Sequence, residues 1–216
     1  MVRHPGFSSV IPRDWGDRPV AIVGGGPSLR GFDFDRLRGR FTVLAVNASM
    51  FDIPFADAGF SIDRKAMREW WARLRQLRYP QYYAVPDFDL PGITIPPTTQ
   101  MHFLLRRPGN VFDRRPGCIS AGGTSGFGAL HLAYHRGARK IILLGFDYGG
   151  RGGNWHHNEQ HYGFRQTQDA KNWAQWARNF DHAAAVLCKS GVEVINASPE
   201  SAITVFPRIT VEEALK

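Results

Sequence analysis

The chain has 216 residues, of which 43% are hydrophobic and 12% aromatic, and its 27 Lys and Arg outnumber 19 Asp and Glu to give a net charge of +8. This length and composition exclude intrinsic disorder and indicate one domain over residues 1–216. No apolar run reaches the roughly 20 residues that a membrane span needs, and two cysteines are too few for a disulfide framework, so we expect a cytoplasmic protein. The positive charge favours partners that carry phosphate, although a generally arginine-rich composition would give the same balance.

Short apolar runs typical of buried strands alternate with helical patterns along the chain. The expected strands span residues 19–24, 41–47, 58–63, 81–85, 140–145 and 192–196. The expected helices span residues 64–78, 124–136 and 167–190, and Thr210 with Glu213 forms a capping box for a last short helix. This alternation predicts an α/β, Rossmann-like fold, in which a doubly wound, mostly parallel sheet carries helices on both faces. The prolines of residues 86–116 disfavour regular structure and indicate a small insert or lid.

The turn after the first expected strand is rich in glycine. Glycines let the backbone approach a phosphate closely, and Pro27 suits the first turn of a helix whose free N–H groups face an anion. Leu29 stands where the dinucleotide-binding fingerprint has its third glycine, and no Gly-Lys-Ser/Thr follows as in a P-loop. The turn is therefore either a phosphate site of another type or a tight strand-to-helix connection. Its candidate residues are Gly24, Gly25, Gly26, Pro27 and Ser28.

Further candidates follow the next strands, because ligands of open α/β sheets bind beyond the carboxyl ends of the strands. Asn47 and Asp63 occupy such positions and either contact a base or ribose or only form turns. Residues 122–126 form a second glycine-rich helix start, in which Thr124 or Ser125 can cap the helix and Gly126 follows. The free N–H groups of that first turn form an anion site, and two such starts in one chain favour phosphate binding.

A polar loop over residues 149–165 contains three histidines, His156, His157 and His161. An imidazole titrates near neutrality, so one of them can serve as a general base. Alternatively, His157 and His161 share a helix face and bind a metal together with Asp147 or Glu159, or the loop is merely solvated. The glycines around the cluster disfavour a preformed helix and so weaken the metal interpretation.

The order of these motifs resembles a known group of proteins. The motifs are Gly-Gly-Gly-Pro-Ser-Leu after the first strand, Asn47 after the second, Thr-Ser-Gly before a helix, Leu-Gly-Phe-Asp-Tyr after a strand, and the histidine loop. The pattern, which spans Val20 to Ile203, resembles the bacterial lipooligosaccharide sialyltransferases. It is also similar to the wider group of motility-accessory flagellin-glycosylation proteins, phage-borne relatives and archaeal 6-hydroxymethylpterin diphosphokinases, and we expect a phage or prophage member.

The sialyltransferase resemblance implies an inverting, metal-independent glycosyltransferase whose nucleotide-activated sugar is a co-substrate, with no other cofactor. The first glycine turn and Asn47 would hold the ribose and phosphate, and the second glycine-rich start would contact the donor. Asp147 and Tyr148 would lie beside the leaving phosphate, and His161 would deprotonate a hydroxyl acceptor. The family carries an asparagine where this chain has Gly25, so the resemblance does not specify the donor sugar.

A basic stripe on the expected helix over residues 64–78 suggests an anionic acceptor. By the 100° rule four arginines fall within about 80° of one another, next to two tryptophans. This surface either grips nucleic acid, as in a phage-type enzyme that glycosylates a modified DNA base in the host cytoplasm, or is a solvated face. The four are Arg64, Arg68, Arg75 and Arg78.

Two other functions are compatible with these motifs. The first is a pyrophosphoryl transferase resembling the pterin kinase, which would need ATP and Mg²⁺ and for which few carboxylates cluster near the glycine turns. The second is a non-catalytic protein that binds a nucleotide or a nucleic acid through the basic stripe.

Overall fold

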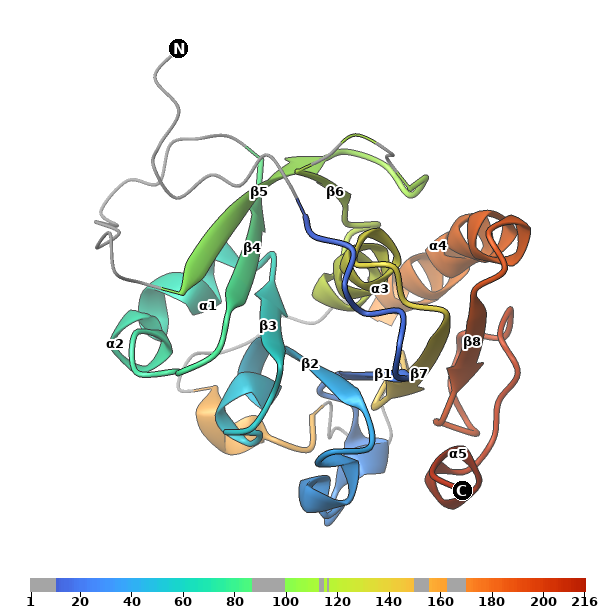
Figure 1. The fold of residues 1–216 in the computed structure, drawn as a ribbon, viewed down its shortest axis with the longest axis horizontal. Helices are drawn as coiled ribbons and strands as arrows, with labels where there is room; N and C mark the ends of the chain where they lie inside the picture. The colour runs from blue at the N-terminus through green and yellow to red at the C-terminus, as the bar shows by residue number, and fades with distance from the viewer. Residues whose placement is uncertain (1–10, 87–99, 113–114, 116, 150–155, 163–169) are drawn as a thin grey trace.

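The computed structural model describes residues 11–86, 100–112, 115, 117–149, 156–162 and 170–216. Within these residues the strands form one eight-stranded sheet in the order β6-β5-β4-β3-β2-β1-β7-β8, and each pairing of neighbours is parallel (Figure 1). The strands are β1 (Val20–Val23), β2 (Thr42–Val46), β3 (Ala58–Ser61), β4 (Gln81–Val85), β5 (Met101–Arg107), β6 (Cys118–Ser120), β7 (Lys140–Leu144) and β8 (Glu193–Asn196).

Both faces of the sheet are covered, because successive side chains of each strand enter opposite cores. Val20 and Ile22 of β1 belong to one core, and Ala21 and Val23 belong to the other. The first core is closed by α3 (Ser125–His135) and α4 (Ala170–Lys189). The second is closed by α1 (Arg64–Glu69), α2 (Trp71–Leu74), α5 (Val211–Ala214) and three short 3₁₀ helices, η1 (Pro27–Leu29), η2 (Phe34–Leu37) and η3 (Asn47–Phe51). The predicted doubly wound α/β fold is confirmed.

Two strands were not expected from the sequence, and one of them corrects the proposed insert. The assignment of residues 86–116 to an insert or lid is wrong for Met101–Arg107, which form β5 between β4 and β6. Met101, Phe103 and Leu104 are buried there, although the strand ends in two arginines that obscure its apolar pattern. Residues 87–99 lie outside the described part of the chain, and β6 has only three residues.

The expected helix over residues 64–78 is instead two short helices, α1 and α2, separated at Trp70. Trp70 leaves the helical backbone, with φ −96° and ψ 5°, while its side chain remains only 4% exposed in the core. The single-helix geometry of the basic stripe is therefore wrong. Arg75 caps the end of α2 and Arg78 lies beyond it, so the four arginines do not share one helix face.

Several helix ends follow their sequence signals. The Thr124 side chain accepts a hydrogen bond from the Phe127 amide at 3.2 Å and caps α3. Gly191 follows α4 with a φ of +68°, and Thr210 and Glu213 form the expected capping box. Among the helices in the described residues, none combines the length and apolar character that a bilayer crossing requires.

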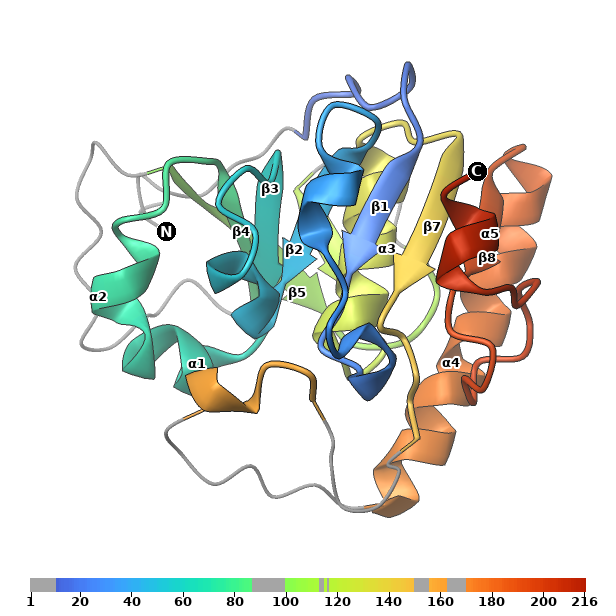
Figure 2. The same cartoon turned by 90° about the horizontal axis from the view of Figure 1, so that it is seen from below.

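The chain reverses its direction of winding across the sheet between β1 and β7. From β1 the strands proceed through β2 to β6 on one side, whereas β7 and β8 extend the other side. In Figure 2 the arrowheads of β1 and β7 point to the edge of the sheet where α1 and η4 (Glu159–His161) lie. Ligands of doubly wound folds bind at such a switch point, beyond the carboxyl ends of the strands.

Candidate functional site

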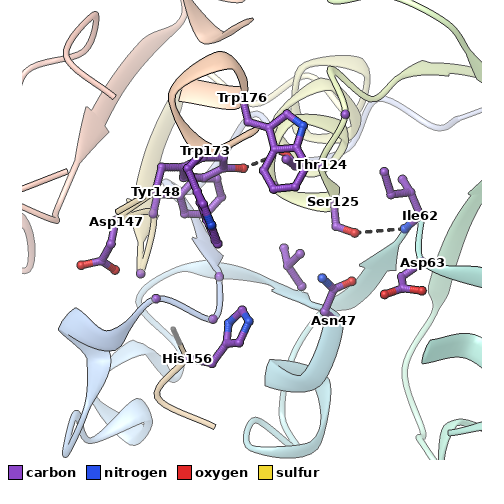
Figure 3. Close-up of a pocket in the computed structure, with 18 of the residues that line it drawn as sticks. Asn47, Ile62, Asp63, Thr124, Ser125, Asp147, Tyr148, His156, Trp173 and Trp176 are labelled. Atoms are coloured by element: carbon purple, nitrogen blue, oxygen red, sulfur yellow. Dashed lines mark hydrogen bonds between the residues drawn. The ribbon is translucent and has the colours of Figure 1, made fainter. Parts of the chain in front are cut away.

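A pocket of about 520 Å³ lies at this switch point, and it is lined by both glycine-rich turns (Figure 3). The turn after β1 and the start of α3, which are about 100 residues apart in the sequence, therefore meet in space. The predicted residues in its wall are Gly24, Gly25, Gly26, Pro27, Asn47, Asp63, Arg64, Thr124, Ser125, Gly126, Asp147, Tyr148 and His156.

Other predicted residues do not line the pocket. Ser28 lies one step behind the wall, where its hydroxyl donates to Oδ2 of Asp147 at 2.8 Å. Three of the four predicted arginines are exposed outside the pocket, and two of the three loop histidines contact Asp52 instead of lining it. These residues are Arg68, Arg75, Arg78, His157 and His161.

The first glycine turn packs directly against the end of β7. The Gly26 amide donates to the Gly145 carbonyl at 2.9 Å. A Cβ on Gly26 would lie 1.7 Å from Oδ2 of Asp147 and 2.5 Å from the Gly145 oxygen, so only glycine fits. A Cβ on Gly25 would similarly lie 2.8 Å from Nδ1 of His156. The glycines of this turn therefore allow three wall segments to meet, whether or not a ligand is present.

The second glycine-rich turn is held by hydrogen bonds from two neighbouring segments. The hydroxyls of Thr124 and Tyr148 are 2.7 Å apart, and the Ile62 amide donates to Oγ of Ser125 at 3.1 Å. Burial raises the pKa of the Tyr148 hydroxyl far above its ordinary value, against a smaller lowering by the bond to Thr124, so this hydroxyl stays protonated at neutral pH. The N–H groups in the first turn of a helix have no intrahelical acceptor. The first turn of α3 lines the pocket through Ser125 and Gly126.

Asn47 and Asp63 occupy the wall at the ends of β2 and β3. Asn47 has a left-handed backbone with φ +54°, and its Oδ1 accepts from the Ser61 hydroxyl at 2.8 Å. The Nδ2 amide of Asn47 is thus the group that can donate to a ligand. Asp63 caps α1, since its Oδ1 accepts from the amides of Lys65 and Ala66 at 2.9 and 3.0 Å. A local structural role therefore accounts for Asp63 in addition to its place in the wall.

The pocket also contains cationic and aromatic residues that the sequence analysis did not select as site residues. Arg106 comes from β5, a strand with no recognised signal, and Lys65 follows the predicted Arg64. Trp173 and Trp176 come from α4, where they pack against the first core and lie half-buried in the pocket wall. The remaining unselected lining residues are Val46, Ile62, Gly123, Gly145, Phe146, Gly149 and Tyr162.

The charge and ring content of the wall favour a ligand that joins an anion to a flat ring. The cations Arg64, Lys65 and Arg106 line the pocket against two carboxylates. Both carboxylates already accept hydrogen bonds within the protein, Asp63 from α1 and Asp147 from Ser28. Aromatic faces such as those of Trp173 and Trp176 stack on planar rings.

Of the three predicted histidines, His156 is the one that lines the pocket, where its ring stacks on Tyr162 with centroids 4.9 Å apart. Both ring nitrogens of His161 are occupied, Nε2 by Asp52 at 2.7 Å and Nδ1 by Arg73 at 3.1 Å. A guanidinium only donates, so Nδ1 of His161 accepts and the proton resides on Nε2. This leaves His161 no nitrogen with which to deprotonate an acceptor.

The alternative metal site is not assembled in the described residues. No group of three or more His, Cys, Asp or Glu side chains is arranged there to hold a metal ion. His157 and His161 face Asp52 from 3.6 and 2.7 Å, whereas Asp147 accepts a hydrogen bond from Ser28.

Replacement of Gly26 by alanine tests the close packing of the first turn. We expect Gly26→Ala to lower the free energy of unfolding by about 1–3 kcal/mol, because its Cβ overpacks the Gly145 backbone. Gly149→Ala is the matched control in the same wall, since the nearest atom to its Cβ would be 3.9 Å away. Denaturant unfolding of both variants measures the difference, and equal stabilities would contradict the packing argument.

No family model and no curated protein sequence matches the chain. Among solved structures, the chain is similar to the MAf glycosyltransferase from Magnetospirillum magneticum AMB-1, with 14% identity and a TM-score of 0.63. That match covers 97% of this chain but 36% of the other, so the chain spans about a third of that protein's length. It is also similar to the sialyltransferase CstII from Campylobacter jejuni, solved with the substrate analogue cytidine-5'-monophosphate, at 15% identity and a TM-score of 0.51 over 90% of this chain and 85% of that one. The chain therefore shares the Rossmann-like α/β fold of these two proteins.

Proposed function

We propose that the chain is a glycosyltransferase whose donor is a nucleotide-activated sugar. The observation that carries this proposal is the convergence of both glycine-rich turns, three cations and two tryptophans on one pocket at the switch point of the sheet. A nucleotide sugar presents the matching groups, which are a phosphate ester, a ribose, a planar base and a sugar ring. The shared fold with two glycosyltransferases supports the same conclusion.

The donor's charged and planar parts can be assigned to different walls. The amides at the start of α3 and in the first glycine turn would hold the phosphate, with Arg64, Lys65 and Arg106 supplying positive charge. Asn47 would donate to the ribose through Nδ2. Trp173 and Trp176 would stack on the base or on the face of the sugar.

The reaction would be an inverting displacement at the anomeric carbon. His156 would take the proton of the acceptor hydroxyl while the acceptor oxygen bonds to the anomeric carbon. The bond from that carbon to the phosphate oxygen would break on the opposite face, and the bond's electrons would leave with the phosphate. The cations Arg64, Lys65 and Arg106 would then neutralise the leaving group without a metal ion.

A panel of nucleotide sugars tests this function directly. We expect at least one to raise the melting temperature and to be hydrolysed slowly in the presence of EDTA. A donor that is turned over only with added metal would contradict the metal-independent mechanism. The absence of stabilisation and turnover with every sugar would overturn the proposal, and pyrophosphoryl transfer from ATP with Mg²⁺ would favour the kinase-like alternative.

The proposed base is tested by His156→Ala. We expect kcat to fall by about 10²–10⁴ while donor affinity changes little, because the base acts on the acceptor. His182→Ala, which removes an exposed histidine of α4, is the control and should keep full activity. Unchanged turnover in His156→Ala would exclude His156 as the base.

Two adjacent arginines of β5 allow the effect of a charge inside the pocket to be compared with the effect of the protein's overall charge. Arg106 lines the pocket, whereas Arg107, the next residue, does not. We expect Arg106→Gln to raise the dissociation constant of the donor by about 10- to 100-fold, since a hydrogen bond to a charged group contributes about 1.5–3 kcal/mol. Arg107→Gln should leave it unchanged. Equal effects in a calorimetric titration would indicate that only long-range charge matters.

We further propose that the acceptor is anionic, with nucleic acid as the form that the sequence suggested. Residues 64–78 contain the cations Arg64, Lys65, Arg68, Arg73, Arg75 and Arg78 and the single acid Glu69. Arg64 and Lys65 reach the pocket, and three further arginines are exposed outside it: Arg68 on α1, Arg75 at the end of α2 and Arg78 beyond that helix.

Binding of duplex DNA at increasing salt, measured by fluorescence anisotropy, tests nucleic acid as the acceptor. We expect affinity to fall steeply with salt, and the slope to decrease by about 0.9 for each arginine–phosphate contact that Arg68→Gln, Arg75→Gln or Arg78→Gln removes. Arg178→Gln on α4 is the control. The absence of salt-dependent DNA binding would leave a glycan as the acceptor, and DNA binding without turnover of any donor would favour the non-catalytic alternative.

A further inference from the structure

The segment between His156 and Tyr162 is anchored by residues that do not line the pocket. His156 and Tyr162, the first and last residues of this segment, both line the pocket and stack on each other. Between them, His157, Asn158 and His161 all turn toward one carboxylate, that of Asp52. The segment that carries two wall residues is therefore anchored to a carboxylate that does not line the pocket.

Asp52 directly follows η3, and its side chain is only 17% exposed. Its Oδ1 lies 2.7 Å from Nε2 of His161. Its Oδ2 accepts from Nδ2 of Asn158 at 3.1 Å and lies 3.6 Å from Nε2 of His157. One carboxylate thus holds three of five consecutive residues.

Arg73 and Trp70 fix the ring and backbone of His161 from the opposite side. The Arg73 guanidinium lies 3.7 Å from the centroid of the Phe51 ring and donates to Nδ1 of His161 at 3.1 Å. This directs the Nε2 proton of His161 to Asp52. The indole N–H of Trp70 donates to the His161 carbonyl at 3.0 Å. The break between α1 and α2 therefore places Trp70 where it supports this segment.

The same segment is tied to the first glycine turn. The His157 amide donates to the Gly25 carbonyl at 2.9 Å. The Asn158 side chain donates to Oγ of Ser49 at 3.3 Å, and that hydroxyl donates to the Gly24 carbonyl at 2.9 Å. A displacement of the segment would consequently also disturb the turn that faces the ligand.

The Asp52 carboxyl is ionised among these donors. Burial raises the pKa of its carboxyl, but hydrogen bonds from His161 and Asn158 and the nearby His157 ring together outweigh burial and hold the pKa below its ordinary value. The group is therefore an anion at neutral pH, and it accepts hydrogen bonds from Asn158 and His161. An asparagine at this position would present an NH₂ donor to side chains that already donate.

We propose that Asp52 is a positioning residue, which holds the segment over residues 156–162 so that His156 and Tyr162 keep their places in the pocket wall. The expected kinetic effect rests on the proposed glycosyltransferase function, whereas the structural effect does not.

Hydrogen exchange of the full chain tests the structural effect without a substrate. In Asp52→Asn we expect faster amide exchange over residues 156–162, because one of the two carboxylate oxygens becomes an NH₂ group, which faces a side chain that already donates. Asp57→Asn is the matched control. Asp57 is also a loop carboxylate, 38% exposed, but its Oδ2 accepts from the backbone amide of Val43 at 2.7 Å. If exchange over residues 156–162 is unchanged in Asp52→Asn, or rises equally in Asp57→Asn, the proposal is overturned.

Kinetics separate positioning from general destabilisation. We expect Asp52→Asn to lower kcat by roughly 100-fold with little change in the KM of the donor, and to cause almost no further loss in a His156→Ala background. Additive losses in the double variant would overturn positioning through His156. If the wild-type chain turns over no nucleotide sugar, the proposed function fails and hydrogen exchange still decides the role of Asp52.

A second variant guards against failure of Asp52→Asn to fold. Arg73→Gln alters an exposed residue and removes the donor that orients the His161 ring. We expect it to accelerate exchange over the same residues to a smaller extent. Unchanged exchange in Arg73→Gln, where Asp52→Asn is unfolded, would count against the network.

Discussion

Close backbone packing between the turn after β1 and the end of β7 is the constraint on which the site depends. The two strands are neighbours at the switch point, and the amides of Gly24 and Gly26 donate to carbonyls at the end of β7. A side chain at Gly26 would collide with both Asp147 and the Gly145 backbone. Because the turn packs closely against the end of β7, a cavity remains between the turn and the carboxyl ends of the other strands.

Segments that are distant in sequence complete this cavity, and hydrogen bonds between them hold the start of α3 in place. The cap of α3 is tied to Tyr148, and Ser125 is tied to the end of β3 through Ile62. Arg106 enters from β5 and the tryptophans from α4. The result is a wall with positive charge, donor amides and flat rings in separate places, which is the arrangement that a nucleotide-activated donor would need.

The histidine loop shows how neighbouring residues of one type acquire different roles. His156 faces the pocket, whereas His157 and His161 face Asp52 and anchor the loop. A partly buried anion with several donors is costly to remove, because its partners would then be left unpaired. One side of the loop therefore lines the pocket and the other side anchors the loop to Asp52. In the proposed reaction, His156 on the pocket side transfers the proton.

What could be determined from the sequence is what local patterns encode. The apolar runs predict β1, β2, β7 and their parallel arrangement. The glycine-rich turns and the capping residues of α3 and α5 are recognisable over a few residues. These features can be predicted because backbone conformation and periodicity are short-range properties. Tertiary structure alone decided which histidine reaches the pocket, since the Asp52–His161 contact joins residues 109 positions apart. It also decided the break at Trp70 and the entry of Arg106 from β5, because burial of an indole and pairing of a strand depend on neighbours that no local pattern specifies.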